Sequence, residues 1–429
     1  MQRRNFVKTA GLAAAAAPQL LRGQEKKLRV GFIGLGRRGL GNLKTVLKRE
    51  DCEVTALSDV YKPNLDKAVE MSPASAKVYP DFRDLIAAND VDAVFIGTPD
   101  HWHAYMTVEA CKAGKDVYVE KPSSVTVHEG QMMVKAAQKY ERVVQVGTQQ
   151  RSGDHFKHAV KMIHNDEIGD IAFVRTWNYS NQGAGIGNPP DSDPPANLDW
   201  DMWLGPAPER RFNANRFGVH PRRFSDFRWF WDYAGGMMTD WGVHLLDIVL
   251  WAMDEPGPRA VSAVGSKYVI QDNRETPDTI LANFEFPSFA CVYENRITNA
   301  QSMFGQNYGI LFHGTKGTMF VDRSRWEILP EKERIATGTR NRIPAAEGES
   351  GNNTTADHWE DFISSVRDRS KPICDMLTGH RSTTIALLGN VALRSKERFE
   401  WDPLAETTEN KEAASFLKRE AREPWKLEL

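Results

Sequence analysis

Short apolar runs alternate with segments of helical periodicity along the first third of the chain. An apolar run at Leu28–Ile33 leads through glycines into a segment where Leu43, Val46 and Leu47 recur at helical spacing. A second apolar run ends at Asp59, and three more end in polar residues within DAVFIGTPDHWH, KDVYVEKP and RVVQVGTQQR. Strands that alternate with helices predict an α/β domain with a doubly wound parallel sheet, over residues 25–150.

The pattern changes after residue 150. Apolar and polar residues alternate in five segments, IGDIAFVRTWNYS, AVSAVGSKYVI, TILANFEFP, ACVYENRI and GILFHGTKGTMFVD, separated by Gly, Pro and Asn turns. Helical spacing returns in two segments between about residues 354 and 396. We therefore predict a second, α+β domain over residues 151–429, with a mainly antiparallel sheet and two terminal helices.

An insert rich in Pro, Asp, Arg and Trp, from about Asn181 to Trp231, interrupts these strands. Loops of this length inside a compact domain are usually functional or disordered, and the aromatic content argues against disorder. Aromatic residues in and around the insert either offer flat faces to a sugar ring or pack the loop onto the sheet. We expect three side chains of this region to lie near a substrate: Tyr179, Arg228 and Trp241.

The composition is that of a globular protein. The 429 residues are 41% hydrophobic and 26% charged, enough for about two or three domains. The formal net charge is -2 and no basic domain or arginine-rich arm occurs, which argues against a nucleic-acid partner and favours small molecules. The cysteines are scattered, so their spacing predicts neither a metal site nor a disulfide framework. They are Cys52, Cys111, Cys291 and Cys374.

The chain starts with paired arginines, Arg3 and Arg4, followed by Phe6, Val7 and Lys8 and a short alanine-rich run. This arrangement resembles a bacterial twin-arginine (Tat) export signal, and the run is too short to cross a bilayer. We therefore predict that residues 1–24 are a signal segment recognised by the Tat translocase. The protein would then be periplasmic or secreted, without a membrane span. An amphipathic or disordered N-terminus is the alternative.

The motif GLGRRG, residues 34–39, lies directly between the first predicted strand and helix. In dinucleotide-binding units the first glycine permits a tight turn, the second lets a pyrophosphate approach the backbone, and the third lets helix and strand pack closely. Asp59, at the end of the second strand, would bind the adenosine ribose hydroxyls. A carboxylate there repels a ribose phosphate and favours NAD, whereas Arg37, Arg38 and Lys62 keep NADP possible.

Polar residues end the predicted parallel strands, at the edge where such sheets bind ligands. Lys121 lies at one of these ends, where Pro122 restricts the backbone, so its ammonium would face the nicotinamide edge and a substrate hydroxyl. An exposed charge at the start of a loop is the alternative. The cofactor-binding residues we predict are Gly34, Gly36, Arg38, Gly39, Asp59, Thr98, Pro99, His101, His103, Glu120, Lys121 and Gln149.

The segment GGMMTDWGVHLLD, residues 235–247, is apolar except for three ionisable side chains. At helical spacing, Asp240, His244 and Asp247 would form one polar seam on a buried face. Burying an unpaired carboxylate or imidazole is costly. The seam is therefore either a hydrogen-bonded structural feature or a catalytic acid or base with its orienting partner.

The motifs GFIGLGRRG, TPDHWHA, EKP and GGMMTDWGVHLLD, in this order and at these separations, resemble those of one family. It is the Gfo/Idh/MocA family of glucose-fructose oxidoreductase, inositol dehydrogenase and rhizopine catabolism proteins. The resemblance implies a Rossmann domain, a second domain whose open sheet often forms homo-oligomers, and terminal helices that pack back between the domains. It also implies a catalytic trio, which falls on Lys121, Asp240 and His244.

On this resemblance we expect an NAD(P)-dependent oxidoreductase that acts on a secondary hydroxyl of a sugar, glycoside or polyol. His244 would accept the hydroxyl proton, Lys121 would stabilise the developing alkoxide, and Asp240 would orient the imidazole or grip a neighbouring hydroxyl. Because free NAD is scarce outside the cytoplasm, an exported enzyme would hold its cofactor tightly and recycle it. An NAD-dependent glycosidase or lyase, working by transient oxidation and elimination, would use the same residues. A third alternative is a non-catalytic sugar-binding protein. The complete set of Lys121, Asp240 and His244 argues against it, because such a protein would need no proton carrier.

Overall fold

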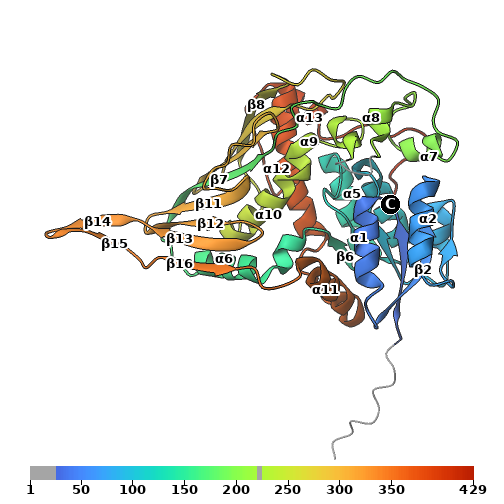
Figure 1. Ribbon diagram of the computed structural model, residues 1–429, viewed down its shortest axis with the longest axis horizontal. Coiled ribbons are helices and arrows are strands. Elements are labelled where there is room, and N and C mark those ends of the chain that lie inside the picture. The colour runs from blue at the N-terminus through green and yellow to red at the C-terminus, as the bar shows by residue number, and fades with distance from the viewer. Residues whose placement is uncertain (1–25, 220–224) are drawn as a thin grey trace, which may run out of the picture.

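The computed structural model describes residues 26–219 and 225–429, which form two domains (Figure 1). The first domain, blue to cyan in Figure 1, is built on a six-stranded sheet, and the second on a nine-stranded sheet. The predicted signal segment, residues 1–24, lies outside the described residues.

The first sheet is parallel throughout, in the order β3-β2-β1-β4-β5-β6. Its central strands are nearly continuous apolar runs because helices cover both faces. The strand order reverses between β1 and β4, which opens a crevice at their carboxyl ends. The predicted doubly wound sheet is confirmed. Its elements, with η for a short 3₁₀ helix, are β1 (Leu28–Ile33), α1 (Arg37–Val46), β2 (Cys52–Ser58), α2 (Lys62–Met71), β3 (Lys77–Val78), α3 (Phe82–Ala87), β4 (Ala93–Ile96), η1 (Asp100–Trp102), α4 (His103–Lys112), β5 (Asp116–Val119), α5 (Val127–Lys139), β6 (Val144–Val146) and η2 (Gln149–Ser152).

The second sheet is open and mixed, in the order β16-β13-β12-β11-β7-β10-β9-β8-β17. Only the β7–β10 pair is parallel within it, so the predicted mainly antiparallel sheet is confirmed. A separate hairpin, β14 (Lys332–Ile335) and β15 (Gly338–Asn341), projects far from the body (Figure 1). The strands of the sheet are β7 (Ile171–Tyr179), β8 (Ala260–Ser266), β9 (Thr279–Glu285), β10 (Ala290–Arg296), β11 (Tyr308–Gly314), β12 (Gly317–Val321), β13 (Arg325–Pro330), β16 (Ala346–Glu349) and β17 (Phe399–Glu400).

Helices cover the inner face of the second sheet and fill the space between the domains. Strand β9 shows the cause, because Ile280, Ala282 and Phe284 alternate onto the buried face. Those side chains share one apolar core with α10 and α12, and α12 also packs on α5 of the first domain. The helices are α6 (Asp154–His164), α9 (Gly236–Asp240), α10 (Gly242–Met253), α11 (Thr354–Asp368), α12 (Met376–Ser395) and α13 (Lys411–Ser415).

Helix α11 completes the core of the first domain, although it comes late in the chain. Its Trp359 is fully buried and stacks on Tyr118 of β5, with ring centroids 4.5 Å apart and planes 12° apart. The Trp359 Nε1 donates to Asn42 Oδ1 of α1 at 2.8 Å. The neighbouring His358 is equally buried and lies 2.8 Å from Ser152 Oγ and 3.0 Å from the Val146 carbonyl oxygen.

The insert folds across the carboxyl edge of the first sheet. It contains α7 (Trp200–Leu204), α8 (Ala214–Phe217) and η3 (Asp226–Trp229), and Figure 1 shows it in green above α2. The Asp199 amide donates to the Val60 carbonyl oxygen at 3.1 Å, and the Lys62 amide donates to the Asn197 carbonyl oxygen at 3.0 Å. The insert is therefore attached to the first domain just beyond β2.

No helix within residues 26–219 and 225–429 is both long and apolar enough to cross a membrane. All four cysteines are buried, and none of them forms a disulfide.

We predict that replacing Trp359 with Ala lowers the free energy of unfolding by about 3–5 kcal/mol, because it removes a fully buried indole. Trp359→Phe keeps a ring beside Tyr118 but leaves Asn42 Oδ1 without its donor, so we expect a smaller loss, about 1–3 kcal/mol. Denaturant titration measures both. Phe304→Ala is the control, since that ring is 53% exposed and its loss should change stability by less than about 0.5 kcal/mol.

Candidate active site

A cavity of about 560 Å³ lies where the two domains and the insert meet. The first domain lines it with the carboxyl ends of its parallel strands. The insert adds Trp203, Phe217 and Phe227, and the second domain adds α9, the start of α10 and Arg323. One continuous space therefore joins the glycine-rich loop to the residues of the predicted catalytic trio.

The glycine-rich loop has the geometry that a bound dinucleotide requires. Gly34 has a φ of +83°, and a Cβ atom there would lie 2.5 Å from the Thr98 nitrogen. A Cβ at Gly39 would lie 2.0 Å from the Gly34 carbonyl oxygen, so this glycine allows α1 to pack closely without facing the cavity. Gly36, the N-cap of α1, lines the cavity, and a Cβ there would meet only Asn64 Nδ2, at 3.9 Å; a helix N-terminus at this place suits a pyrophosphate.

Asp59 lines the cavity at the end of β2. Its Oδ2 accepts from the Leu35 amide at 2.6 Å and its Oδ1 accepts from the Tyr61 amide at 2.8 Å. Burial raises the pKa of this carboxyl to about 6, although both amides favour the ionised form. The carboxylate is thus held beside the glycine-rich loop, at the edge of the cavity, as the predicted contact with an adenosine ribose requires.

Glu120 organises the middle of the cavity. Its Oε1 accepts from Arg38 Nε at 2.7 Å, Asn42 Nδ2 at 3.2 Å and Gln149 Nε2 at 3.2 Å. The carboxylate is buried, whereas the Arg38 side chain is 42% exposed. Glu120 therefore positions two predicted cofactor-binding side chains, Arg38 and Gln149.

The remaining strand-end residues divide into two groups. Thr98, Pro99 and His103 line the cavity, and His103 lies 2.7 Å from the Pro122 carbonyl oxygen through Nδ1 and 3.0 Å from the Thr98 carbonyl oxygen through Nε2. His101 does not line it. Its ring is buried, 3.0 Å from the Trp203 carbonyl oxygen, and burial lowers its pKa to about 3. His101 therefore contacts the insert outside the cavity lining.

Lys121 and Asp240 form a buried ion pair at the catalytic end of the cavity. Lys121 Nζ donates to Asp240 Oδ1 and to the Asp240 carbonyl oxygen, each at 2.8 Å. Arg228 Nε donates to the same Oδ1 at 3.0 Å. Burial alone would raise the pKa of Asp240, but the two cations outweigh it and lower the pKa to about 2. Asp240 is therefore ionised and bound to Lys121 and Arg228.

His244 lines the cavity one turn further on. Its side chain makes no hydrogen bond to any described residue, and its buried Nδ1 has no partner there. Burial, and then the positive charges of Lys121, Arg323 and Arg38, hold the pKa of His244 well below 6.5. The imidazole is thus uncharged at neutral pH and able to accept a proton.

The single polar seam predicted for residues 235–247 is wrong. The helix is interrupted at Trp241, between α9 and α10, and only Asp240 and His244 line the cavity. Asp247 is fully buried elsewhere, where its Oδ1 accepts from Arg151 Nε at 2.8 Å and from Ser382 Oγ at 2.6 Å. Within the described chain no hydrogen bond joins Asp240 to His244, so the carboxylate does not orient the imidazole here.

Of the three expected substrate-binding side chains, only Arg228 lines the cavity. Tyr179 lies on β7, where its hydroxyl donates to Glu294 Oε1 at 2.6 Å and Arg296 covers its ring. Trp241 does not line the cavity, and Tyr308 packs against its ring. Among the other tryptophans of the region, Trp203 reaches the cavity; most of them pack the insert against the protein.

Two lining residues that sequence patterns did not reveal are Gln150 and Arg323. Gln150 follows the predicted Gln149, and its Nε2 donates to the His244 carbonyl oxygen at 3.2 Å. Arg323 comes from the turn between β12 and β13, far from every motif. A glutamine pair at a strand end was a usable signal, whereas nothing in the sequence indicated Arg323.

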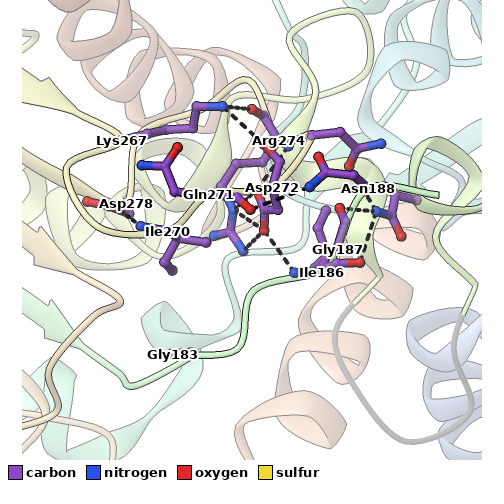
Figure 2. A network of polar contacts seen from close by, with 12 residues as sticks. Gly183, Ile186, Gly187, Asn188, Lys267, Ile270, Gln271, Asp272, Arg274 and Asp278 are labelled. Atoms are coloured by element: carbon purple, nitrogen blue, oxygen red, sulfur yellow. Dashed lines mark hydrogen bonds and ion pairs between the residues drawn. The ribbon is translucent and has the colours of Figure 1, made fainter. Parts of the chain in front are cut away.

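A buried ion pair anchors the start of the insert (Figure 2). Arg274 Nε and Asp272 Oδ1 are 2.8 Å apart, and both side chains are excluded from solvent. Asp272 Oδ2 accepts from the Ile186 amide at 2.8 Å, while Lys267 Nζ donates to the Arg274 carbonyl oxygen at 2.8 Å. The insert is thereby tied to the β8–β9 connection as well as to the first domain.

Two family models match the chain. An oxidoreductase family model for an NAD-binding Rossmann fold, Gfo/Idh/MocA, matches residues 28–148. The model for the C-terminal α/β domain of the same oxidoreductase family matches residues 168–283 and 310–427. Together the two matches cover most of the chain.

Individual proteins give a consistent comparison. The uncharacterized oxidoreductase YrbE of Bacillus subtilis is 26% identical over 304 residues, 70% of this chain and 75% of that protein. A glycosyl hydrolase family 109 protein of Shewanella baltica is 31% identical over 174 residues, 33% of this chain and 38% of that protein. The crystal structure of aldose-aldose oxidoreductase from Caulobacter crescentus shares the fold, with a TM-score of 0.66 at 20% identity over 87% of this chain and 100% of that one.

We predict that Asp59 makes cofactor preference depend on pH. With a pKa of about 6 the carboxyl is ionised near pH 7.5 and largely protonated near pH 5.5. Protonation removes the charge that repels a ribose phosphate, so the affinity for NADP relative to NAD should rise as the pH falls. Asp59→Asn should raise this ratio about tenfold or more already near pH 7.5, as measured by fluorescence titration of both cofactors.

Asp59→Asn also separates the titration of the carboxyl from that of the ribose phosphate, which itself titrates near pH 6. Asp84→Asn on α3 is the matched control, since Asp84 is exposed and does not line the cavity. An unchanged cofactor ratio in Asp59→Asn would contradict the assignment.

Proposed function

The chain belongs to the Gfo/Idh/MocA family of NAD-binding oxidoreductases, and on this premise we propose that it oxidises a secondary hydroxyl of a sugar, glycoside or polyol. One observation carries the proposal: a single cavity joins the glycine-rich loop and Asp59 to Lys121, Asp240 and His244. The aldose-aldose oxidoreductase that shares the fold supports a carbohydrate substrate.

The side chains in the cavity supply the proton chemistry. When bound, the nicotinamide cofactor supplies the hydride acceptor. His244 is uncharged and accepts the hydroxyl proton, while the Lys121 ammonium donates to the developing alkoxide. Asp240 fixes the ammonium through two contacts 2.8 Å long, so Lys121 needs little reorganisation.

A second candidate is an NAD-dependent glycosidase or lyase, in which transient oxidation acidifies a neighbouring C–H and permits elimination. The similarity to the Shewanella baltica glycosyl hydrolase family 109 protein favours it. Both reactions begin with the same oxidation at Lys121 and His244, and their products differ. A non-catalytic sugar-binding protein is the least supported candidate, because binding alone does not require these groups.

We also propose a tightly bound, recycled NAD in an exported protein. The paired arginines Arg3 and Arg4 support Tat export to the periplasm, where free cofactor is scarce. The insert supports slow release, because it is attached beyond β2 and adds aromatic side chains to the wall of the cavity. NADP remains the alternative cofactor.

The outer face of the nine-stranded sheet is the surface we propose for a homo-oligomer. Val264 and Leu281 are cross-strand partners on β8 and β9, and they are 63% and 38% exposed. Contiguous exposed apolar patches mark surfaces that another chain covers, and this pair would contribute to such a patch.

The first experiment is to purify the protein without added cofactor, release any bound nucleotide by denaturation, and measure its absorbance and mass. Anaerobic titration with sugars, glycosides and polyols then follows reduction at 340 nm. Bound NAD that one class of sugar reduces supports a recycling enzyme, and product analysis separates net oxidation from hydrolysis. Turnover only with added NAD rejects recycling, and absence of nicotinamide binding rejects the proposal.

We predict that His244→Asn lowers kcat about 100- to 10,000-fold, the usual contribution of a general base, while the cofactor remains bound. His158→Asn, at an exposed histidine on α6, is the control and should retain wild-type kcat. In the wild type, kcat/KM should stay level as the pH falls through 6.5, because the pKa of His244 lies well below that value. A loss of activity centred near 6.5, or an active His244→Asn protein, would assign the base elsewhere.

A further inference from the structure

Arg323 reaches the cavity from a rigid turn between β12 and β13. Asp322 Oδ1 accepts from the Ser324 amide at 2.8 Å and from the Arg325 amide at 2.9 Å. The Asp322 carbonyl oxygen lies 2.9 Å from His155 Nε2. The turn is therefore fixed both internally and to α6, and Asp322 directs its Oδ1 to its own turn rather than to the neighbouring Arg323.

The Arg323 guanidinium is held at two points beside the catalytic residues. Its Nε donates to Gln150 Oε1 at 3.0 Å, and Gln150 in turn donates to the His244 carbonyl oxygen. Its central carbon lies 4.5 Å from the centroid of the Trp241 ring. The Trp241 ring covers one face of the guanidinium, and the hydrogen bond to Gln150 uses only Nε. The two terminal NH₂ groups therefore have no acceptor among the described residues. They form a preorganised pair of donors.

Arg323 also differs from the other cations that line the catalytic end of the cavity. Lys121 and Arg228 bind Asp240, and Arg38 binds Glu120. Within residues 26–219 and 225–429, Arg323 has no carboxylate partner. Among these four cations of the described chain, Arg323 is therefore the one whose charge no carboxylate contacts directly.

We propose that Arg323 determines substrate specificity by binding an anionic group, a carboxylate or phosphate, carried by the substrate near the hydroxyl that Lys121 and His244 handle. The inference rests on the proposed function and narrows it to acidic sugars or polyols. A planar guanidinium matches the geometry of a carboxylate or phosphate and binds it through two parallel hydrogen bonds. Because Trp241 and Gln150 already immobilise the side chain, little rotamer entropy is lost on binding.

The test compares matched acidic and neutral sugars, D-glucuronate with D-glucose, on cofactor-loaded protein. Calorimetric titration gives the affinity for each sugar without requiring turnover, and reduction at 340 nm gives kcat/KM. The wild type should prefer the acid. Arg323→Gln should lower the ratio of acid to neutral affinity about 10- to 100-fold, the loss expected for a charged hydrogen-bond pair. Arg323→Lys should give an intermediate ratio, because lysine keeps the positive charge but lacks the two parallel N–H donors of the guanidinium.

Arg325→Gln is the matched control, because it removes the same charge two residues along, from a side chain that pairs with Glu327 outside the cavity lining. It should leave the ratio within about twofold of wild type, because surface substitutions away from a site have small effects. Thermal unfolding of each variant verifies that it is folded.

Three outcomes overturn the proposal. The wild type shows no preference for the acid, Arg323→Gln leaves the ratio unchanged, or Arg323→Gln weakens retention of NAD while the ratio persists. The last outcome assigns the guanidinium to the cofactor diphosphate. Preferential binding of the acid that Arg323→Gln abolishes, without any reduction at 340 nm, would confirm the anion site and count against oxidation of that sugar, so a failure of the anion site and a failure of the oxidation are distinguishable.

Discussion

The buried carboxylate of Asp240 is the interaction on which the catalytic end of the cavity depends. It binds Lys121 from the end of β5 and Arg228 from the insert, so one anion joins three parts of the chain that are remote in sequence. Removing one charge from a buried set leaves the others uncompensated, at a cost of about 3–5 kcal/mol. The position of the insert and the position of the Lys121 ammonium are therefore coupled through a single oxygen atom.

Much of the first domain could be predicted because its signals are local. A glycine motif lies between a strand and a helix in sequence as in space, and the carboxyl ends of parallel strands must share one edge. This reasoning located Thr98, Glu120, Lys121 and Gln149, which all line the cavity. The prediction for His101 was wrong because this residue lies on the 3₁₀ helix η1 beyond β4, where its ring is buried against the insert, 3.0 Å from the Trp203 carbonyl oxygen.

For the second domain, the sequence predicted the type of sheet but not which side chains contact each other. A strand pattern shows alternation but not which face the rest of the chain covers, so Tyr179 could not be assigned to a side. The helical pattern at residues 235–247 did not show the interruption at Trp241. The prediction therefore placed Asp247 on one face with Asp240 and His244, whereas it binds Arg151 away from the cavity. Arg323 belongs to a turn without a motif, and only the folded sheet brings it beside Trp241.

The packing of α11 has a consequence for the order in which the protein forms. Tyr118 and Asn42 belong to the first domain, yet the indole that fills the space between them is supplied by Trp359. During synthesis the first domain emerges from the ribosome with that slot open, and contacts between such distant segments form late. The nucleotide-binding half of the molecule therefore lacks part of its own core until α11 has been translated, so its final packing depends on a segment more than 200 residues further along the chain.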